Sequence, residues 1–217
     1  MLPFFCRELL CLLLPDECPV CGRSLRWGES TLCDSCLSVA FASKPEPRFD
    51  LSSLIQVESA CEWNSESRAL VRGFKYYYRP QLISRLLPLV EEGLKLKPEK
   101  IDLILPVPLH RARRRMRGYN QAELLGRLLA EILQVPMLPD TLIRNRYTGT
   151  QTRLQEAERR RNVSGAFEVV SRSVLQDRSL LIVDDVITTG ATLQEIAAIL
   201  PTRQVRAWTL IRRLAEL

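Results

Sequence analysis

Two adjacent carboxylates and three hydroxyls stand at the boundary between an apolar run and an amphipathic one. The run Leu180–Val183 is apolar without alternation, and Asp184 and Asp185 follow it directly. A Thr-Thr-Gly-Ala-Thr turn then occupies Thr188–Thr192, and no Gly or Pro interrupts the chain between this turn and Pro201. The pattern predicts a strand buried on both faces, a polar turn and a helix, in that order.

The turn offers the groups that bind a phosphate. The first amide hydrogens of a helix have no partner within it, and the helix dipole favours an anion at that end. The residues of this predicted phosphate-binding turn are Thr188, Thr189, Gly190, Ala191 and Thr192. Its glycine lets the backbone curl around an anion where a side chain would clash. The turn has neither the lysine of a nucleotide-triphosphate loop nor the G-x-G-x-x-G of dinucleotide folds.

The two aspartates suit a sugar attached to that phosphate. Ligands of parallel sheets bind beyond the carboxyl ends of the strands, which is where Asp184 and Asp185 are expected. Adjacent strand residues point to opposite faces, so this pair cannot flank one glycosidic bond from a shared side. They fit better as acceptors for neighbouring sugar hydroxyls. We therefore predict a ligand that contains ribose with a 5′-phosphate.

Four of the seven cysteines form two matched C-x2-C pairs, Cys18 with Cys21 and Cys33 with Cys36. Two such pairs supply the four thiolates of a tetrahedral zinc site, and a segment of about forty residues is too small to hold a core unaided. We predict structural zinc (Zn²⁺) with no open position for catalysis. Two disulfides or unliganded core thiols are the alternatives.

Positive charge is concentrated in two segments. The 217 residues carry a net charge of +6, from 31 Lys and Arg against 25 Asp and Glu. Residues 110–117 and 144–161 hold eleven of the basic residues but only two of the acidic ones, so they carry +9 and the rest of the chain −3. This distribution indicates a localised anion site rather than general adhesion to polyanions.

The chain divides into three parts. We expect a short helix over Leu9–Leu14 and the cysteine module within 1–44, a Pro-rich linker at 45–53 and an α/β domain at 54–217. In that domain, strands are predicted at 54–63, 101–107, 180–185 and 205–211, with helices at 66–78, 81–94 and 120–133. This alternation is typical of a parallel sheet flanked by helices. The sequence shows neither a signal peptide nor a transmembrane segment, which predicts a cytoplasmic protein with reduced cysteines.

The run "LLIVDDVITTGAT", Leu180–Thr192, resembles the phosphoribosyl-pyrophosphate (PRPP) signature of type I phosphoribosyltransferases. The resemblance implies a phosphoribosyltransferase-like fold for the α/β domain. It also implies that Asp184 and Asp185 are the catalytic pair, which holds the ribose 2′- and 3′-hydroxyls with the help of magnesium (Mg²⁺). Thr188–Thr192 would hold the 5′-phosphate.

Two further blocks, "PVPLHRARRRMRGYNQAELLGRLLA" and "RNRYTGTQTRLQEAERRRNVSGAF", resemble the ComF family of competence proteins, as does the cysteine quartet. The resemblance covers nearly the whole chain. It implies a role in natural transformation, in which single-stranded DNA enters the cytoplasm. Single-stranded DNA and the DNA-uptake proteins of the inner membrane are then the expected partners.

The resemblance to phosphoribosyltransferases places the loop at 106–108 beside the pyrophosphate and makes Tyr147–Arg161 a mobile loop that closes over PRPP. The candidate residues for pyrophosphate or another anion are Pro106, Val107, Arg113, Arg114, Arg117, Gln151 and Arg160. Guanidinium groups bind phosphate oxygens in pairs, as lysine cannot. A solvated basic face and an ordinary exposed loop are the alternatives.

Several neighbouring residues allow more than one interpretation. Gly118, Asn120 and Gln121 either start the helix that follows or contact the ligand, or do both. The aromatic trio Tyr76–Tyr78 suits core packing better than stacking on single-stranded bases. His110 is interpreted as a loop residue with local hydrogen bonds rather than a general base.

Two functions compete at this point. A phosphoribosyltransferase would pass ribose 5-phosphate from PRPP to an unidentified nitrogen base, with Mg²⁺ and arginines stabilising the pyrophosphate that leaves. A DNA-handling protein on the same scaffold, which the ComF resemblance implies, would bind single-stranded DNA. A regulator that senses PRPP without turnover is a third interpretation. All of them need anion sites, so the motifs alone do not choose between them.

Overall fold

The computed structural model of the chain describes the residues 17–26, 29, 31–42, 49–52, 55–76, 82–93, 100–146 and 164–213. Several predictions concern residues outside these ranges. They are the helix over Leu9–Leu14, the loop Tyr147–Arg161 with its candidate residues Gln151 and Arg160, and part of the aromatic trio.

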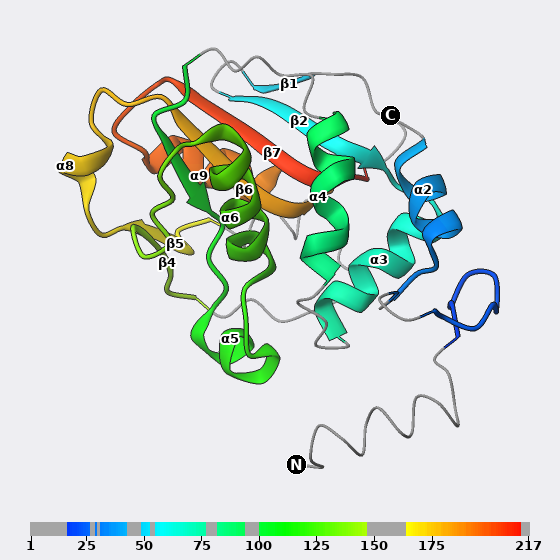
Figure 1. The fold of residues 1–217 in the computed structure, drawn as a ribbon. Helices are drawn as coiled ribbons and strands as arrows, with labels where there is room; N and C mark the ends of the chain where they lie inside the picture. The colour runs from blue at the N-terminus through cyan, green and yellow to red at the C-terminus, as the bar shows by residue number, and fades with distance from the viewer. Residues whose placement is uncertain are drawn as a thin grey trace.

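A five-stranded sheet forms the centre of the molecule (Figure 1). In spatial order its strands are β1 (Phe49–Ser52), β2 (Ile55–Glu62), β7 (Val205–Arg212), β6 (Leu180–Ile187) and β3 (Leu103–Pro106). β1 is antiparallel to β2, and the other four strands are parallel. The predicted fold class, a parallel sheet flanked by helices, is confirmed. β1 differs from the prediction, because it forms a strand within the stretch 45–53 that was predicted to be a linker.

Helices cover both faces of the sheet. One face carries α3 (Ser65–Tyr76), α4 (Leu82–Gly93) and α6 (Gln121–Leu133), and the opposite face carries α9 (Ala191–Ile199). The shorter elements are α2 (Asp34–Ala42), α5 (Arg111–Arg117), α8 (Arg172–Leu175) and the hairpin of β4 (Leu142–Arg144) with β5 (Phe167–Val169). None of the helices among the described residues combines the length and the apolar character that crossing a bilayer requires.

The burial of β6 explains its unbroken apolar run. Leu181 and Val183 pack in the hydrophobic cluster beneath α3, α4 and α6, whereas Leu180 and Ile182 pack in the cluster on the α9 side. A strand covered on both faces needs apolar residues at successive positions rather than at alternate ones. The two aspartates therefore follow the part of β6 that is shielded from solvent on both sides.

The cysteine module is continuous with the main core. Leu32 and Leu37 belong to the same buried cluster as Leu70 and Phe74 of α3. Figure 1 shows α2 beside α3, at one end of the helical layer. The module is thus packed onto the α/β domain through shared apolar side chains.

Candidate functional site

The acidic pair lies near the carboxyl end of the central strand β6, as expected. β6 continues to Ile187, so both aspartates are part of the strand itself. Asp184 is in register with Thr209 of β7, and Thr209 with Ser59 of β2. The Thr209 and Ser59 hydroxyl oxygens lie 2.7 Å apart. Because partners in register share a face, these three polar side chains form a row across the sheet.

Asp185 is paired with a residue that the sequence did not indicate. The Lys75 Nζ atom, at the end of α3, lies 2.9 Å from Asp185 Oδ2. The Asp185 side chain is only 12% exposed, so this pairing offsets the cost of burying its charge. Lys75 escaped prediction because α3 and β6 are more than one hundred residues apart in the sequence.

Asp184 has a different environment. Burial, together with the negative charge of Asp185, raises the pKa of Asp184 to about 7. The Asp185 amide donates a hydrogen bond of 2.8 Å to Asp184 Oδ1, and the charges of Lys75 and Arg144 also favour the ionised form, but these effects are smaller. The Asp184 carboxyl therefore holds its proton to a higher pH than an aspartate in water does.

This raised pKa predicts a pH-dependent stability. Between about pH 4 and pH 7 the folded chain retains a proton on Asp184 that the unfolded chain has released, so the free energy of unfolding falls as the pH rises through this window. Relative to Asp184→Asn, the wild type should lose on the order of a few kcal/mol across it. Urea denaturation of both proteins at several pH values measures this difference, and parallel pH profiles would contradict the prediction.

The predicted phosphate-binding turn lies directly after β6. Gly190 has φ +74° and precedes the first residue of α9, Ala191. The Ala191 amide lies 3.4 Å from the Thr189 hydroxyl oxygen. A Cβ atom at Gly190 would lie 2.3 Å from the Leu51 Cδ1 atom of β1. Both the backbone angle at position 190 and the close contact with β1 therefore favour glycine. The sequence had suggested a different reason for this glycine, namely the close approach of the backbone to an anion.

The loop after β3 borders the aspartates. Pro106 is in register with Val183, and the Val107 amide donates to the Val183 carbonyl at 2.9 Å. The Asn120 side chain donates in turn to the Val107 carbonyl at 3.0 Å. These contacts hold the predicted pyrophosphate loop at the edge of the sheet where Asp184 lies.

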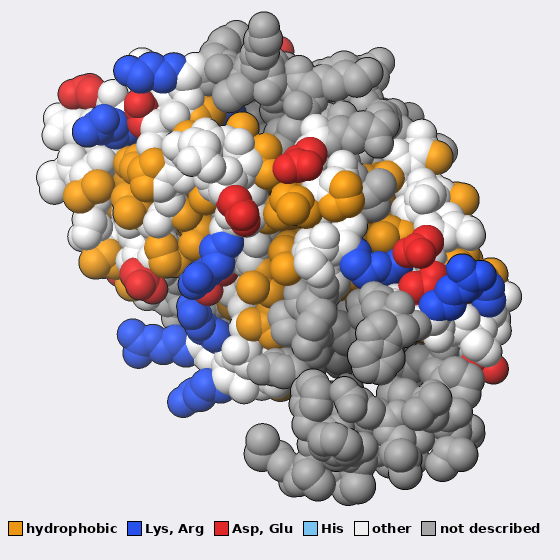
Figure 2. Space-filling model, viewed as in Figure 1, with side chains coloured by type: hydrophobic (Ala, Val, Ile, Leu, Met, Phe, Trp, Pro, Cys, Tyr) orange, Lys and Arg blue, Asp and Glu red, His pale blue; other side chains and the backbone are white. Residues whose placement is uncertain are grey.

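The arginine-rich segment forms helix α5, a segment for which the sequence predicted neither helix nor strand. His110 caps its start by accepting a hydrogen bond from the Ala112 amide at 3.3 Å, so the predicted local hydrogen bond of His110 is confirmed. The basic residues of this region include Arg111 and Arg115, which are both exposed. Figure 2 shows Lys and Arg side chains protruding at the end of the molecule where Figure 1 places α5.

The candidate arginines of α5 differ in their contacts. Arg114 pairs with Glu123 through both guanidinium Nη atoms, at 2.5 and 3.2 Å. Arg117 donates to the Gln121 side-chain oxygen at 2.6 Å. Arg113 is half-buried and faces Arg144 closely enough to influence its pKa. Two of the three candidates are therefore held by side chains of α6 in this structure.

The residues around the start of α6 are structural. Asn120 is the N-cap of α6 and accepts a hydrogen bond from the Ala122 amide at 3.1 Å. The Gln121 side chain donates to the Phe74 carbonyl at 3.0 Å, and the Tyr119 hydroxyl donates to the same oxygen. Of the two interpretations, helix-start chemistry is confirmed for Asn120. Ligand contact by these residues stays a prediction.

Arg144 is a further candidate that sequence reasoning did not single out. It pairs with Phe167 across the β4–β5 hairpin, with its guanidinium carbon 5.2 Å from the ring centre. Burial, and then repulsion from Arg113, lowers the pKa of Arg144, while Asp184 acts in the opposite direction. Arg144 thus brings positive charge to the Asp184 side of the sheet. Its only sequence signal was its place at the start of the second basic segment.

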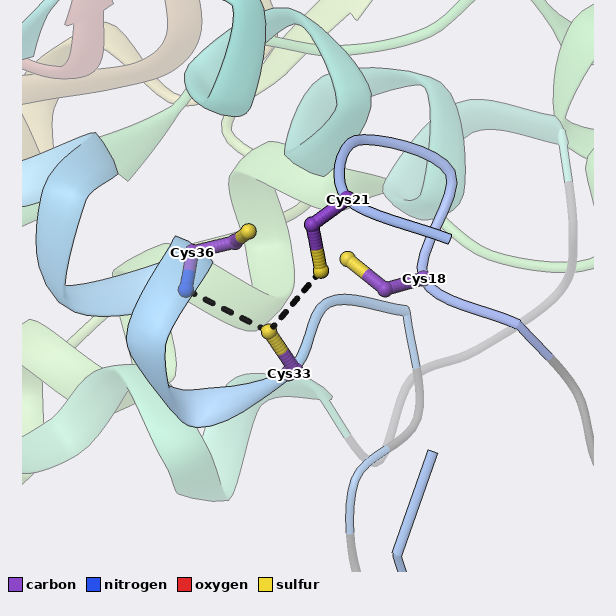
Figure 3. A group of neighbouring side chains, drawn as sticks. All are labelled: Cys18, Cys21, Cys33 and Cys36. Atoms are coloured by element: carbon purple, nitrogen blue, oxygen red, sulfur yellow. Dashed lines mark hydrogen bonds between the residues drawn. The ribbon is translucent and has the colours of Figure 1, made fainter. Parts of the chain in front are cut away.

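The four cysteines converge, as Figure 3 shows. The Sγ atoms of Cys18, Cys21, Cys33 and Cys36 all lie within 4.8 Å of one another. The Cys21 and Cys33 sulfurs are 3.7 Å apart, close to the edge of about 3.8 Å of a tetrahedron with Zn–S bonds of about 2.3 Å. All described cysteines are free thiols, so the disulfide alternative is contradicted for this quartet. The cluster could bind a metal such as zinc.

Glu29 organises the loop between the two cysteine pairs. Its carboxylate accepts hydrogen bonds from the Arg26 amide at 2.6 Å and the Asp34 amide at 2.8 Å, and it pairs with Arg23 at 2.7 Å. Although burial acts against it, this set of donors lowers the pKa of Glu29 to about 2. At neutral pH the carboxylate therefore ties the segment after the first cysteine pair to the start of the second pair.

Parallel strands flanked by helices, with an acidic pair at their carboxyl edge and a polar turn before a helix, define an α/β protein. No family model matches the chain. It is 33% identical over 204 residues to Competence protein F of Haemophilus influenzae, covering 90% of this chain and 84% of that protein. It is also 33% identical to the DNA utilization protein YhgH of Escherichia coli O157:H7, covering 97% of this chain and 96% of that protein. The chain belongs to the ComF family of competence proteins.

More distant similarities extend to other proteins. Competence protein ComFC of Bacillus subtilis is 26% identical over 96% of this chain and 83% of its own length. Among solved structures, the glutamine PRPP amidotransferase of B. subtilis has a TM-score of 0.42 and 23% identity, over 64% of this chain and 30% of that chain. Adenine phosphoribosyltransferase from Leishmania tarentolae has a TM-score of 0.40 and 10% identity, over 78% of this chain and all of that chain.

Proposed function

We propose that this ComF-family protein binds PRPP or another ribose 5-phosphate ligand at the end of β6 and handles single-stranded DNA during natural transformation. The observation that carries the proposal is the placement of Asp184 and Asp185 directly before the Thr188–Thr192 turn, at the carboxyl edge of a parallel sheet. The relatives named for competence and DNA utilization support the DNA role.

The roles of the residues follow from the contacts available to each. The amides and hydroxyls of Thr188–Thr192 hold the 5′-phosphate, and Asp184 and Asp185 accept hydrogen bonds from the ribose hydroxyls. Their carboxylate oxygens are ligands that suit Mg²⁺, which neutralises pyrophosphate when bound. The Pro106–Val107 loop and Arg113 border the pyrophosphate, since both lie on the Asp184 side of the strand ends.

The cysteine cluster holds structural zinc in this proposal. Thiolate sulfur is a preferred zinc ligand, and four of them complete a tetrahedral shell without an open position. The cluster therefore supplies folding energy to the module and takes no part in chemistry.

Saturable binding tests the pocket. Calorimetric titration of the purified protein with PRPP and Mg²⁺ should give a dissociation constant in the micromolar to low millimolar range. This range corresponds to a binding free energy of about −8 to −4 kcal/mol. Release of pyrophosphate from PRPP in the presence of a cell metabolite extract would demonstrate transferase activity in addition to binding. A lack of saturable binding at millimolar PRPP would overturn the proposed pocket.

Helix α5 is the proposed contact for single-stranded DNA. Arg111 and Arg115 are four residues apart on α5, so they share one exposed face of the helix. DNA-uptake proteins of the inner membrane would pass single-stranded DNA to this protein in the cytoplasm. The phosphates of the DNA would then contact this face of α5. Because Arg114 is already paired with Glu123, we expect the exposed arginines to make the phosphate contacts.

Charge reversal of this face should weaken binding in a salt-dependent manner. Each phosphate contact contributes about 0.7 to the log–log salt slope of single-strand affinity, so Arg111→Glu/Arg115→Glu should flatten the slope by at least about 1.4. Fluorescence anisotropy with a labelled oligonucleotide measures this slope. Arg178→Glu/Arg203→Glu is the matched control, since both arginines are exposed near the opposite edge of the sheet. Equal slopes for the two double variants would exclude α5.

A further inference from the structure

Lys75 connects the acidic pair to the cysteine module through α3. It lies one residue before the end of α3 and pairs with Asp185 at 2.9 Å. The pairing occupies one Asp185 oxygen, Oδ2, and restricts the orientations open to the carboxylate. The position of the ammonium, and hence the orientation of this acid, depends on what holds the carboxyl end of α3.

The cysteine module holds one side of α3. A Cβ atom at Gly73 would lie 2.1 Å from the Thr31 Cγ2 atom, so the Thr31 side chain of the module packs against the backbone of α3 two residues before Lys75. Cys33 and Leu32 share a buried cluster with Phe74. Such close contact transmits small displacements, because protein interiors are close-packed.

Two further contacts fasten the same region. Arg85 of α4 donates to the Leu32 carbonyl at 2.8 Å and pairs with Asp34 at 2.7 Å, which ties the module to the helical layer. On the other side, the Tyr119 hydroxyl and the Gln121 side chain both donate to the Phe74 carbonyl. The last turn of α3 is therefore clamped between the cysteine module and the start of α6.

We propose that the cysteine module is a positioning element of the sugar site, because it holds α3 where the Lys75 ammonium meets Asp185. This inference rests on the proposed ribose 5-phosphate pocket, since it gives Lys75 the task of orienting Asp185 toward a sugar hydroxyl. Lys75 is a positioning residue that acts through Asp185. The proposed phosphate-binding turn, between β6 and α9, lies outside this chain of contacts.

A substitution at the contact of the module with α3 tests the coupling. Gly73→Ala should push α3 away from Thr31 and weaken PRPP binding by about tenfold, roughly the effect of one hydrogen bond to a charged group. Affinity for inorganic phosphate, which needs only the turn, should stay unchanged. Adding Thr31→Gly removes the atoms that clash and should restore PRPP affinity. Gly126→Ala of α6 is the matched control, because its Cβ would crowd only the flexible Met137 side chain, with Sδ at 2.7 Å, and would meet Ile104 at an ordinary contact distance of 3.6 Å.

The role of Lys75 is tested by combining variants. Lys75→Met should weaken PRPP binding about tenfold, Lys75→Arg should retain most of the affinity, and Gly73→Ala should add no further loss to Lys75→Met. Additive losses, or equal losses for PRPP and inorganic phosphate, would overturn the coupling. No PRPP binding by the wild type would instead overturn the proposed pocket.

A second measurement needs neither PRPP nor a variant. Acylation of Lys75 in the full chain, followed by mass spectrometry, reports whether its ammonium is held by Asp185. Removal of metal from the wild-type protein with a chelator should raise the rate at which Lys75 is acylated severalfold. The acylation rate of Lys100, whose side chain is 87% exposed, should stay constant and is the internal control. Unchanged Lys75 labelling after confirmed metal loss would overturn the proposal independently of the ligand.

Discussion

Replacement of both Asp184 and Asp185 by asparagine is expected to lower the affinity for PRPP by at least about 100-fold. A hydrogen bond to a charged group contributes about 1.5–3 kcal/mol, and two of them would be weakened together. A 100-fold change corresponds to about 2.7 kcal/mol, so this expectation is conservative. Affinity for inorganic phosphate, measured by the same calorimetric titration, should change little because the Thr188–Thr192 turn remains intact.

The control for this experiment is Asp177→Asn. Asp177 is exposed near the amino end of β6, and asparagine tolerates its left-handed φ of +57°. It should bind PRPP like the wild type. If Asp184→Asn/Asp185→Asn also retained wild-type affinity, the acidic pair would not contact the sugar, and the ribose site would have to be sought elsewhere on the sheet edge.

Loss of one cysteine of the quartet is the second large effect. Cys33→Ser should lower bound zinc from about one ion per chain to nearly none, because serine does not replace a thiolate ligand. The melting temperature should fall by about 10 °C or more, since structural zinc contributes several kcal/mol to folding and one kcal/mol corresponds to about 2–4 °C at this size. The whole described domain, and not the cysteine module alone, should be destabilised, because Cys33 belongs to the same buried cluster as residues of α3 and α4.

Cys61→Ser separates metal binding from the burial of a thiol. Cys61 is buried in β2, its sulfur donates to the Leu210 carbonyl at 3.3 Å, and it is not among the four cysteines whose sulfurs converge. Burial raises the pKa of this thiol to about 12. This variant should keep its zinc. Metal analysis of both proteins decides the matter, and full zinc content in Cys33→Ser would show that the quartet is not the site.

The elements of the sheet were predictable because their signals are local. The unbroken apolar run of β6, the helical period of α6 and the polar turn between β6 and α9 each lie within a few residues, where periodicity and capping rules apply. The cysteine cluster was predictable for the same reason, since the spacing within each pair places two sulfurs on one turn. β1 and the β4–β5 hairpin escaped prediction because strands this short have no clear period.

The amino-acid sequence alone established that an acidic pair precedes a turn rich in hydroxyls, and that four thiols can meet. Only the tertiary structure decided which charges face that pair. Lys75 reaches Asp185 from α3, Arg144 approaches Asp184 from the hairpin, and Arg114 is withdrawn toward Glu123. Contacts of this kind depend on how helices and strands far apart in the sequence pack together, and no local pattern records that packing.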